Sequence, residues 1–194
     1  MPNEQRTFGD EEYIYRLRLQ QEMPVHENNV LDGCIMIDDE KILFRHNDMF
    51  DGRATIIMPA KFDIVPEDVV DMKYPPDDRP DVIYTFPGTE INFTLTYKDD
   101  LPSEDEDIPV VKKLIQRMVM RDFPESKIIE SIVIDASEKT VAYFDFVADL
   151  YNLIFFFSLD EQLILGSFDC PVCDIADWKP VFLQILKSIE THVF

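Results

Sequence analysis

Residues 127–169 contain four successive segments with the composition of β-strands, separated by short polar turns. They read KIIESIVID, TVAYFDFVAD, YNLIFFFSLD and EQLILGSFD. Such short connections favour antiparallel pairing of neighbouring strands. Leu153–Phe157 is apolar at every position, which predicts a central strand covered on both faces. Asp145, between Phe144 and Phe146, is expected to point toward solvent at the rim of the sheet.

Apolar spacing predicts one helix before this run of strands and another after it. The first covers about residues 108–122, with an apolar stripe of Val111, Leu114, Ile115 and Met118. Its Lys113, Arg117 and Arg121 share one polar face, which we expect to be solvated. The second is DWKPVFLQILKSIE, whose broad apolar face is formed by Trp178, Val181, Phe182, Ile185, Leu186 and Ile189.

These elements predict an α+β fold, an antiparallel β-sheet with helices packed on its faces (an α/β/α sandwich). With 194 residues, 46% of them hydrophobic and 15 of them Phe, the chain can build one substantial core. We expect an α+β sandwich domain over residues 53–194, and a polar segment with short strands over 1–52 that belongs to the same domain.

Ile91–Tyr97 alternates in polarity, so its Asn92 and Thr94 face is expected to be solvated.

The chain is strongly acidic, with 39 Asp and Glu against 18 Lys and Arg and a net charge of -21. This charge disfavours binding to nucleic acid or to an anionic membrane. It favours a basic protein partner, unless the acidic surface serves only solvation. The N-terminus lacks a signal-peptide pattern, and no apolar run approaches the ~18–20 residues of a membrane span. Together with three cysteines, an odd number, this predicts a cytoplasmic protein.

Cys170 and Cys173 form a CxxC motif, the sharpest chemical signal in the chain. A zinc site needs four ligands, and no histidine has the matching spacing. Thiol redox chemistry needs the motif at a helix N-terminus, whereas the predicted helix begins about four residues later. We expect structural thiols at a strand-to-helix junction, with redox or metal binding as the alternative. Five scattered Gly and the absence of GxSxG and HExxH motifs predict no catalytic residues, no metal site and no cofactor.

A binding surface is indicated by Tyr74, Arg79 and Tyr84. Three prolines between positions 75 and 80 exclude a helix or a central strand there. Exposed Tyr, Pro and Arg in a rigid loop are typical of binding hot spots. The alternative is a loop that packs against its own domain.

From about residue 54 to residue 190 the chain resembles the PsbP/DcrB-like group, which includes the Ran-binding Mog proteins. The resemblance lies in ATIIMPAKFDI, KYPPDDRPDVIYTF, INFTLTY, IPVVKKLIQRMVM, the four-strand run and the closing GSFDC…DWKPVFLQILKSIE. It implies an α/β/α sandwich without a catalytic centre. Members of the group are binding or accessory proteins, including photosystem subunits, Ran-binding factors and chaperones of secreted effectors. No functional residue of the group maps onto this chain.

The resulting hypothesis is a non-enzymatic protein-binding or accessory module, chaperone-like activity included. One alternative is a thiol redox or metal-binding protein that uses Cys170 and Cys173. Another is a small-ligand or lipid-binding domain with a pocket between sheet and helices. The sequence leaves the oligomeric state and the identity of the partner open.

Overall fold

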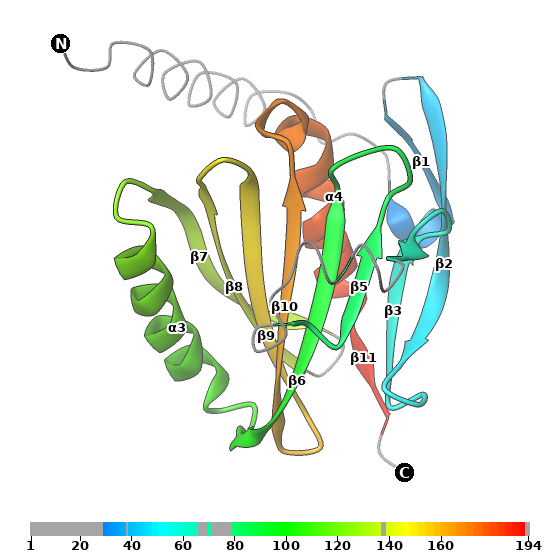
Figure 1. Ribbon diagram of the computed structural model, residues 1–194. Helices are drawn as coiled ribbons and strands as arrows, with labels where there is room; N and C mark the ends of the chain where they lie inside the picture. Colours follow the sequence, from blue (N-terminus) through cyan, green and yellow to red (C-terminus); the bar gives the residue numbers. More distant parts are fainter. Residues whose placement is uncertain (1–28, 38, 66–69, 71–78, 137–138, 193–194) are drawn as a thin grey trace, which may run out of the picture.

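The computed structural model describes residues 29–37, 39–65, 70, 79–136 and 139–192 (Figure 1). Its strands form one antiparallel sheet of seven, in the order β4-β5-β6-β10-β9-β8-β7, and one of four, in the order β1-β2-β3-β11. The larger sheet contains β4 (Asp63–Ile64), β5 (Val82–Thr85), β6 (Asn92–Pro102), β7 (Lys127–Ala136), β8 (Lys139–Val147), β9 (Tyr151–Leu159) and β10 (Gln162–Cys170). The smaller contains β1 (Cys34–Ile37), β2 (Glu40–Met49), β3 (Ala54–Pro59) and β11 (Glu190–Thr191). The helices that the structure describes over their full length are α3 (Ile108–Asp122) and α4 (Ile175–Lys187), and 3₁₀ turns lie at Val30–Asp32 and Val172–Asp174.

The helices lie on opposite faces of the larger sheet (Figure 1). α3 packs over β8 and β9, while α4 packs on the other face and also contacts β3 of the smaller sheet. The antiparallel α+β architecture is therefore confirmed. The four-stranded sheet is a feature that the sequence did not predict.

Aromatic side chains fill the space between the larger sheet and α4. Phe168 of β10 stacks on Phe182 of α4, with ring centroids 4.5 Å apart, and contacts Phe93 of β6 at 4.7 Å. Gly166, between Phe155 of β9 and Leu95 of β6, leaves room for a ring: a Cβ there would lie 2.1 Å from Cζ of Phe155. The predicted four-strand run is confirmed. The closing helix is confirmed too, but it spans Ile175–Lys187, so Ile189, which was expected on its apolar face, is buried just beyond its end. The prediction that β9 is a buried central strand is confirmed too.

On the opposite face, α3 has the predicted limits but a different buried side. Ile108 is buried and Val111 and Ile115 are partly buried, whereas Leu114 and Met118 are 58% and 48% exposed. The prediction of one stripe containing all four apolar residues was therefore wrong. The cause is that α3 has two apolar rows, Ile108–Val111–Ile115 and Val110–Leu114–Met118, and packs on the sheet through the first.

The polar side of β6 is also buried, against the expectation that it would be solvated. The Asn92 side chain donates to the Asp169 carboxylate at 2.7 Å, and the Thr94 and Ser167 hydroxyls lie 2.9 Å apart. Asn92 and Thr94 are 8% and 6% exposed. Cross-strand hydrogen bonds with β10 let these groups be buried without losing their partners.

Asp145 contradicts its predicted position at a solvated rim, because its side chain is 0% exposed. Its carboxylate accepts from the Glu130 backbone N–H at 2.6 Å and from the Tyr151 hydroxyl at 2.8 Å. Lys179 of α4 places its Nζ 2.8 Å from the same carboxylate and 3.1 Å from that of Glu130. The ion pair thus joins the sheet to α4, and a partner from a distant helix explains why a charge is tolerated in an apolar strand.

Candidate functional site

An unusual turn connects β2 to β3. Asp51 and Gly52, with φ of 58° and 81°, form its central pair, and the Arg53 N–H donates to the Phe50 carbonyl at 3.3 Å. Asp-Gly is a preferred pair for such a hairpin turn. Phe50 itself has φ of 52°, a strained conformation for a bulky residue, of a kind that clusters at functional sites.

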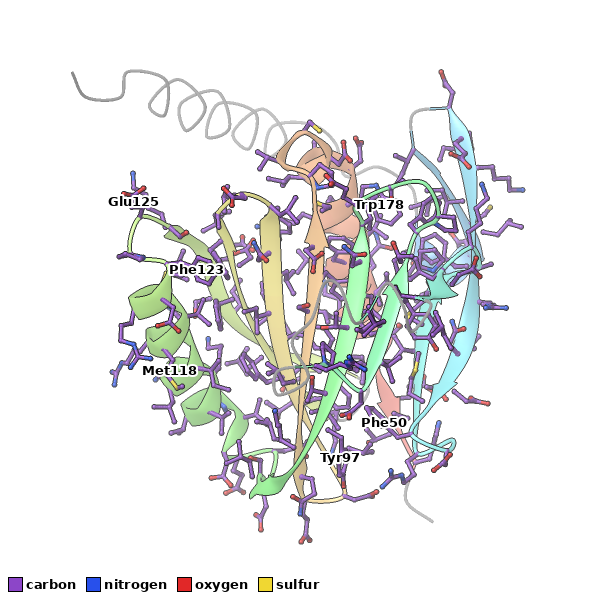
Figure 2. The ribbon with its side chains drawn as sticks, viewed as in Figure 1. Phe50, Tyr97, Met118, Phe123, Glu125 and Trp178 are labelled. Atoms are coloured by element: carbon purple, nitrogen blue, oxygen red, sulfur yellow. The ribbon has the colours of Figure 1, made fainter. Side chains whose placement is uncertain are left out.

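The turn is held against the larger sheet through Tyr97 of β6. The Phe50 and Tyr97 rings lie 5.8 Å apart (Figure 2), and the Arg53 guanidinium lies 5.4 Å from the centre of the Tyr97 ring. Arg53 also donates to the Phe50 carbonyl at 2.8 Å and pairs with Asp160, in the β9–β10 turn, at 3.1 Å. These contacts fix the position of Phe50.

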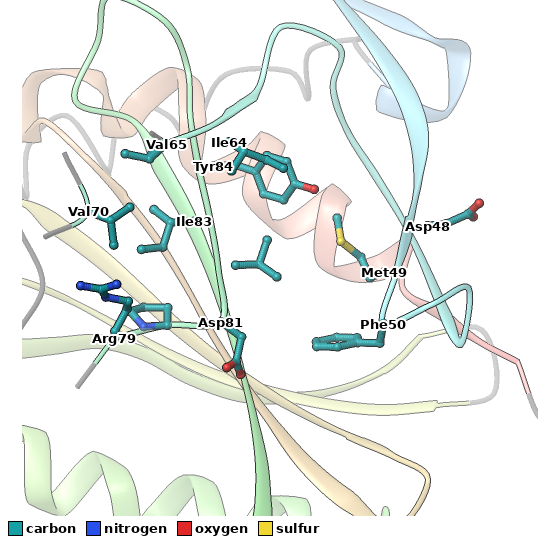
Figure 3. Close-up of a pocket in the computed structure, with 12 residues that line it drawn as sticks. Asp48, Met49, Phe50, Ile64, Val65, Val70, Arg79, Asp81, Ile83 and Tyr84 are labelled. Carbon is teal, nitrogen blue, oxygen red and sulfur yellow. The ribbon is translucent and has the colours of Figure 1, made fainter. Parts of the chain in front are cut away.

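Phe50 forms one wall of an open groove with a volume of about 560 Å³ (Figure 3). The groove lies between the end of β2 and the β4–β5 edge of the larger sheet. Its lining is mostly apolar, with two carboxylates and one guanidinium. The lining residues are Asp48, Met49, Phe50, Ile64, Val65, Val70, Arg79, Pro80, Asp81, Val82, Ile83 and Tyr84.

Two of the three predicted binding residues, Arg79 and Tyr84, line this groove together. Tyr74 lies outside the described residues. The sequence analysis missed Phe50 and Ile64, and Ile64 is 68% exposed. A bulky aromatic directly before Asp-Gly is the one local signal that could have drawn attention to Phe50.

The polar groups of the groove are held by neighbouring elements. Asp81 accepts a hydrogen bond from the Tyr97 backbone N–H at 2.6 Å. The Tyr84 ring stacks against Phe93 with centroids 6.2 Å apart. Burial raises the pKa of Tyr84 above its ordinary value and the charge of Arg45 acts against this rise, so the phenol remains protonated at neutral pH. The groove therefore offers apolar contacts and fixed hydrogen-bonding groups.

The structure separates the environments of Cys170 and Cys173. Cys170, at the end of β10, is buried, while Cys173 is exposed. Burial raises the pKa of the Cys170 thiol far above its ordinary value, and Asp174, Asp169 and Cys173 add to the rise. A reactive thiol needs the opposite shift, so the environment of Cys170 disfavours a reactive thiolate. All three cysteines lie among the described residues, and none forms a disulfide.

No group of three or more His, Cys, Asp or Glu side chains within the described residues is arranged to hold a metal ion. No helix within them is long and apolar enough to cross a membrane.

Comparisons with known proteins connect the chain to solved structures alone. No family model matches it, and no curated protein matches it by sequence. The solution structure of cyanobacterial PsbP (CyanoP) from Synechocystis sp. PCC 6803 is similar with a TM-score of 0.58 and 12% identity, over 77% of this chain and 92% of that one. The chain has the PsbP fold. The resemblance inferred from the sequence is thereby confirmed at the level of the fold.

Two further solved structures are similar at lower TM-scores. PA94 of Pseudomonas aeruginosa, described as a putative regulator of unknown function, has a TM-score of 0.44 at 11% identity, over 78% of this chain and 99% of that one. The Ran-binding protein Mog1p of Saccharomyces cerevisiae has a TM-score of 0.43 at 12% identity, over 77% and 96% of the two chains.

Proposed function

We propose that the chain is a non-enzymatic binding module that receives another protein in the groove between β2 and the β4–β5 edge. The observation that carries this proposal is the apolar lining held open to solvent. Ile64 is 68% exposed at one wall, and Phe50, in its strained turn, forms the other. Exposed apolar residues around a few fixed polar groups are characteristic of binding surfaces.

The shape of the groove favours a protein over a small ligand. Small-molecule sites enclose most of the ligand surface, whereas this groove is open to solvent. The net charge of -21 and the lining carboxylates of Asp48 and Asp81 favour a basic partner. We therefore expect a partner segment that inserts an apolar side chain and carries Lys or Arg beside it.

The environment of the polar groups supports a role in binding rather than catalysis. Asp81 is engaged by the Tyr97 N–H at 2.6 Å, and the raised pKa of Tyr84 keeps its phenol protonated. A phenol held protonated in this way is suited to donating a hydrogen bond rather than to acting as a general base.

Site-specific photo-crosslinking tests the groove directly. A photoreactive phenylalanine analogue replaces Ile64 in one tagged protein and Leu43 in a control, and each is irradiated in lysate of its own host. Leu43 is 54% exposed on β2 but does not line the groove. We expect a discrete adduct from position 64 that is absent from position 43, weakens as salt rises, and is identified by mass spectrometry.

Substitutions then test whether the groove provides the affinity. Ile64→Glu and Arg79→Glu should each reduce capture of the identified partner at least tenfold, whereas Leu43→Glu should leave it unchanged. The unfolding midpoint of each variant shows whether it is folded. Ile64 is the more informative site, because its side chain is exposed and Ile64→Glu should therefore change the stability little. Equal adducts from positions 64 and 43, or capture that is insensitive to Ile64→Glu, would refute the proposal.

A further inference from the structure

The outward row of apolar residues on α3 is not explained by folding. Val110, Leu114 and Met118 are 67%, 58% and 48% exposed. They recur every fourth residue, so they form a continuous ridge of about 12 Å along the helix. Large exposed apolar side chains scattered singly are ordinary, but a contiguous row indicates a contact surface.

A row of cations runs beside this ridge. Lys113, Arg117 and Arg121 also recur every fourth residue, and each follows a ridge residue by three positions. Residues three and four apart are neighbours on a helix surface, so the two rows are parallel and adjacent. Neither Lys113 nor Arg117 forms an ion pair with another described residue, and Arg121 pairs at 3.2 Å with Asp122, where both side chains are exposed.

The charge of α3 is opposite to that of the chain. The helix carries four cations, Lys112, Lys113, Arg117 and Arg121, and one anion, Asp122. The whole chain has a net charge of -21. Lys112 is buried, with its Nζ 3.4 Å from the Ile132 carbonyl of β7, so the outward cations are the other three. This local reversal of sign marks α3 as a place where an acidic partner is attracted rather than repelled.

We propose that the outer face of α3 docks an acidic amphipathic helix of a partner protein. The partner's apolar residues, spaced every third or fourth position, pack against Val110, Leu114 and Met118. Its Asp or Glu side chains lie over Lys113, Arg117 and Arg121. A helix fits this surface because rows of residues four apart are the ridges that interdigitate when two helices pack. An anionic membrane is the less suitable occupant, since the chain as a whole is repelled by one.

The surface is independent of the proposed groove. The groove lies at the β4–β5 edge of the larger sheet, whereas α3 packs over β8 and β9 beyond β6 and β10 (Figure 1). The two proposals can therefore succeed or fail separately.

A set of designed probes tests the docking surface. The main probe is a fluorescein-labelled 20-residue helical peptide with Leu at alternating third and fourth positions and Glu beside the leucines. One control peptide has Lys in place of every Glu, and another has Ser in place of every Leu. Fluorescence anisotropy with the full chain should show binding of the main probe at least tenfold tighter than either control, with affinity falling as salt rises from 50 to 300 mM.

Substitutions locate the binding. Leu114→Glu and Arg117→Glu should each weaken the main probe at least tenfold, while Leu43→Glu and Arg45→Glu, at exposed positions of β2, should not change it. Equal affinity for the three peptides, or equal loss with the β2 variants, would overturn the proposal. The proposal would also be overturned if the chain bound vesicles of phosphatidylcholine and phosphatidylglycerol, lost that binding with Leu114→Glu, and did not bind the acidic peptide. The unfolding midpoint of each variant confirms that it is folded.

Discussion

The buried ion pair between Asp145 and Lys179 permits a quantitative prediction about stability. Asp145 is 0% exposed, and the Lys179 side chain is 11% exposed. Asp145→Ala removes the acceptor that lies 2.8 Å from the Lys179 Nζ and leaves that cation in the interface between the sheet and α4. Breaking a buried pair on one side typically costs about 3–5 kcal/mol.

The expected value lies at the lower end of this range. Glu130 remains 3.1 Å from the Lys179 Nζ and retains part of the electrostatic interaction. The Glu130 backbone N–H and the Tyr151 hydroxyl, however, lose an acceptor at 2.6 and 2.8 Å, which together adds about 1–2 kcal/mol. We therefore expect Asp145→Ala to reduce the free energy of unfolding by about 3 kcal/mol. Lys179→Met, which leaves Asp145 without its cation, should reduce it by a similar amount.

Urea unfolding followed by tryptophan fluorescence measures these effects. The single tryptophan, Trp178, adjoins Lys179 in α4 and is 4% exposed. A double-mutant cycle measures the coupling between the two residues. The loss of unfolding free energy in the variant with both Asp145→Ala and Lys179→Met should be smaller than the sum of the two single losses by at least about 1.5 kcal/mol, because neither charge of the pair stays buried alone. As a control, Glu40→Ala breaks an exposed pair with Lys61 and should cost less than about 1 kcal/mol. A coupling energy near zero would refute the reasoning.

Other consequences of the structure can be measured in the same way. Gly166→Ala should destabilise the chain by about 1–3 kcal/mol through overpacking, because the new Cβ would lie 2.1 Å from a Phe155 ring atom. Adding Phe155→Leu should recover part of the loss in urea unfolding, whereas strictly additive losses would exclude that contact as the cause. Maleimide labelling at pH 8 should modify exposed Cys173 within minutes and spare Cys170, whose pKa is raised by burial. Peptide mapping by mass spectrometry reads this out, and rapid labelling of Cys170 in the folded chain would show that its burial is wrong.

The parts of the fold that the sequence predicted depend on local periodicity. The strands from β7 to β10 follow one another closely in the sequence, and each pairs with its neighbour. α3 and α4 were equally recognisable from helical spacing. The four-stranded sheet was not, because it pairs β3 with β11, whose Thr55 and Glu190 are far apart in the chain.

Individual side chains were harder to place than elements. Asp145 resembled a rim residue because its partner Lys179 belongs to a helix that is distant in sequence. A lone acid in an apolar strand and a lone Lys beside Trp178 in an apolar helix were separate oddities that only the fold brings together. The groove is similarly composite, because Phe50, Ile64 and Tyr84 come from three separate segments. Composition identified two of its residues, and no periodicity connects them with the rest.

The two proposed surfaces share a property that distinguishes them from the core. Phe50 is held in a strained conformation, and Ile64 and Leu114 are exposed, so none of these features is explained by the stability of the free chain. Because the groove and α3 lie toward opposite edges of the seven-stranded sheet, one partner need not displace the other. Leu114→Glu should leave the crosslink at position 64 intact, and Ile64→Glu should leave the acidic peptide bound. If either variant lost both the crosslink and the binding of the acidic peptide, a single extended interface or a folding defect would be indicated. The unfolding midpoint of the variant distinguishes these two explanations.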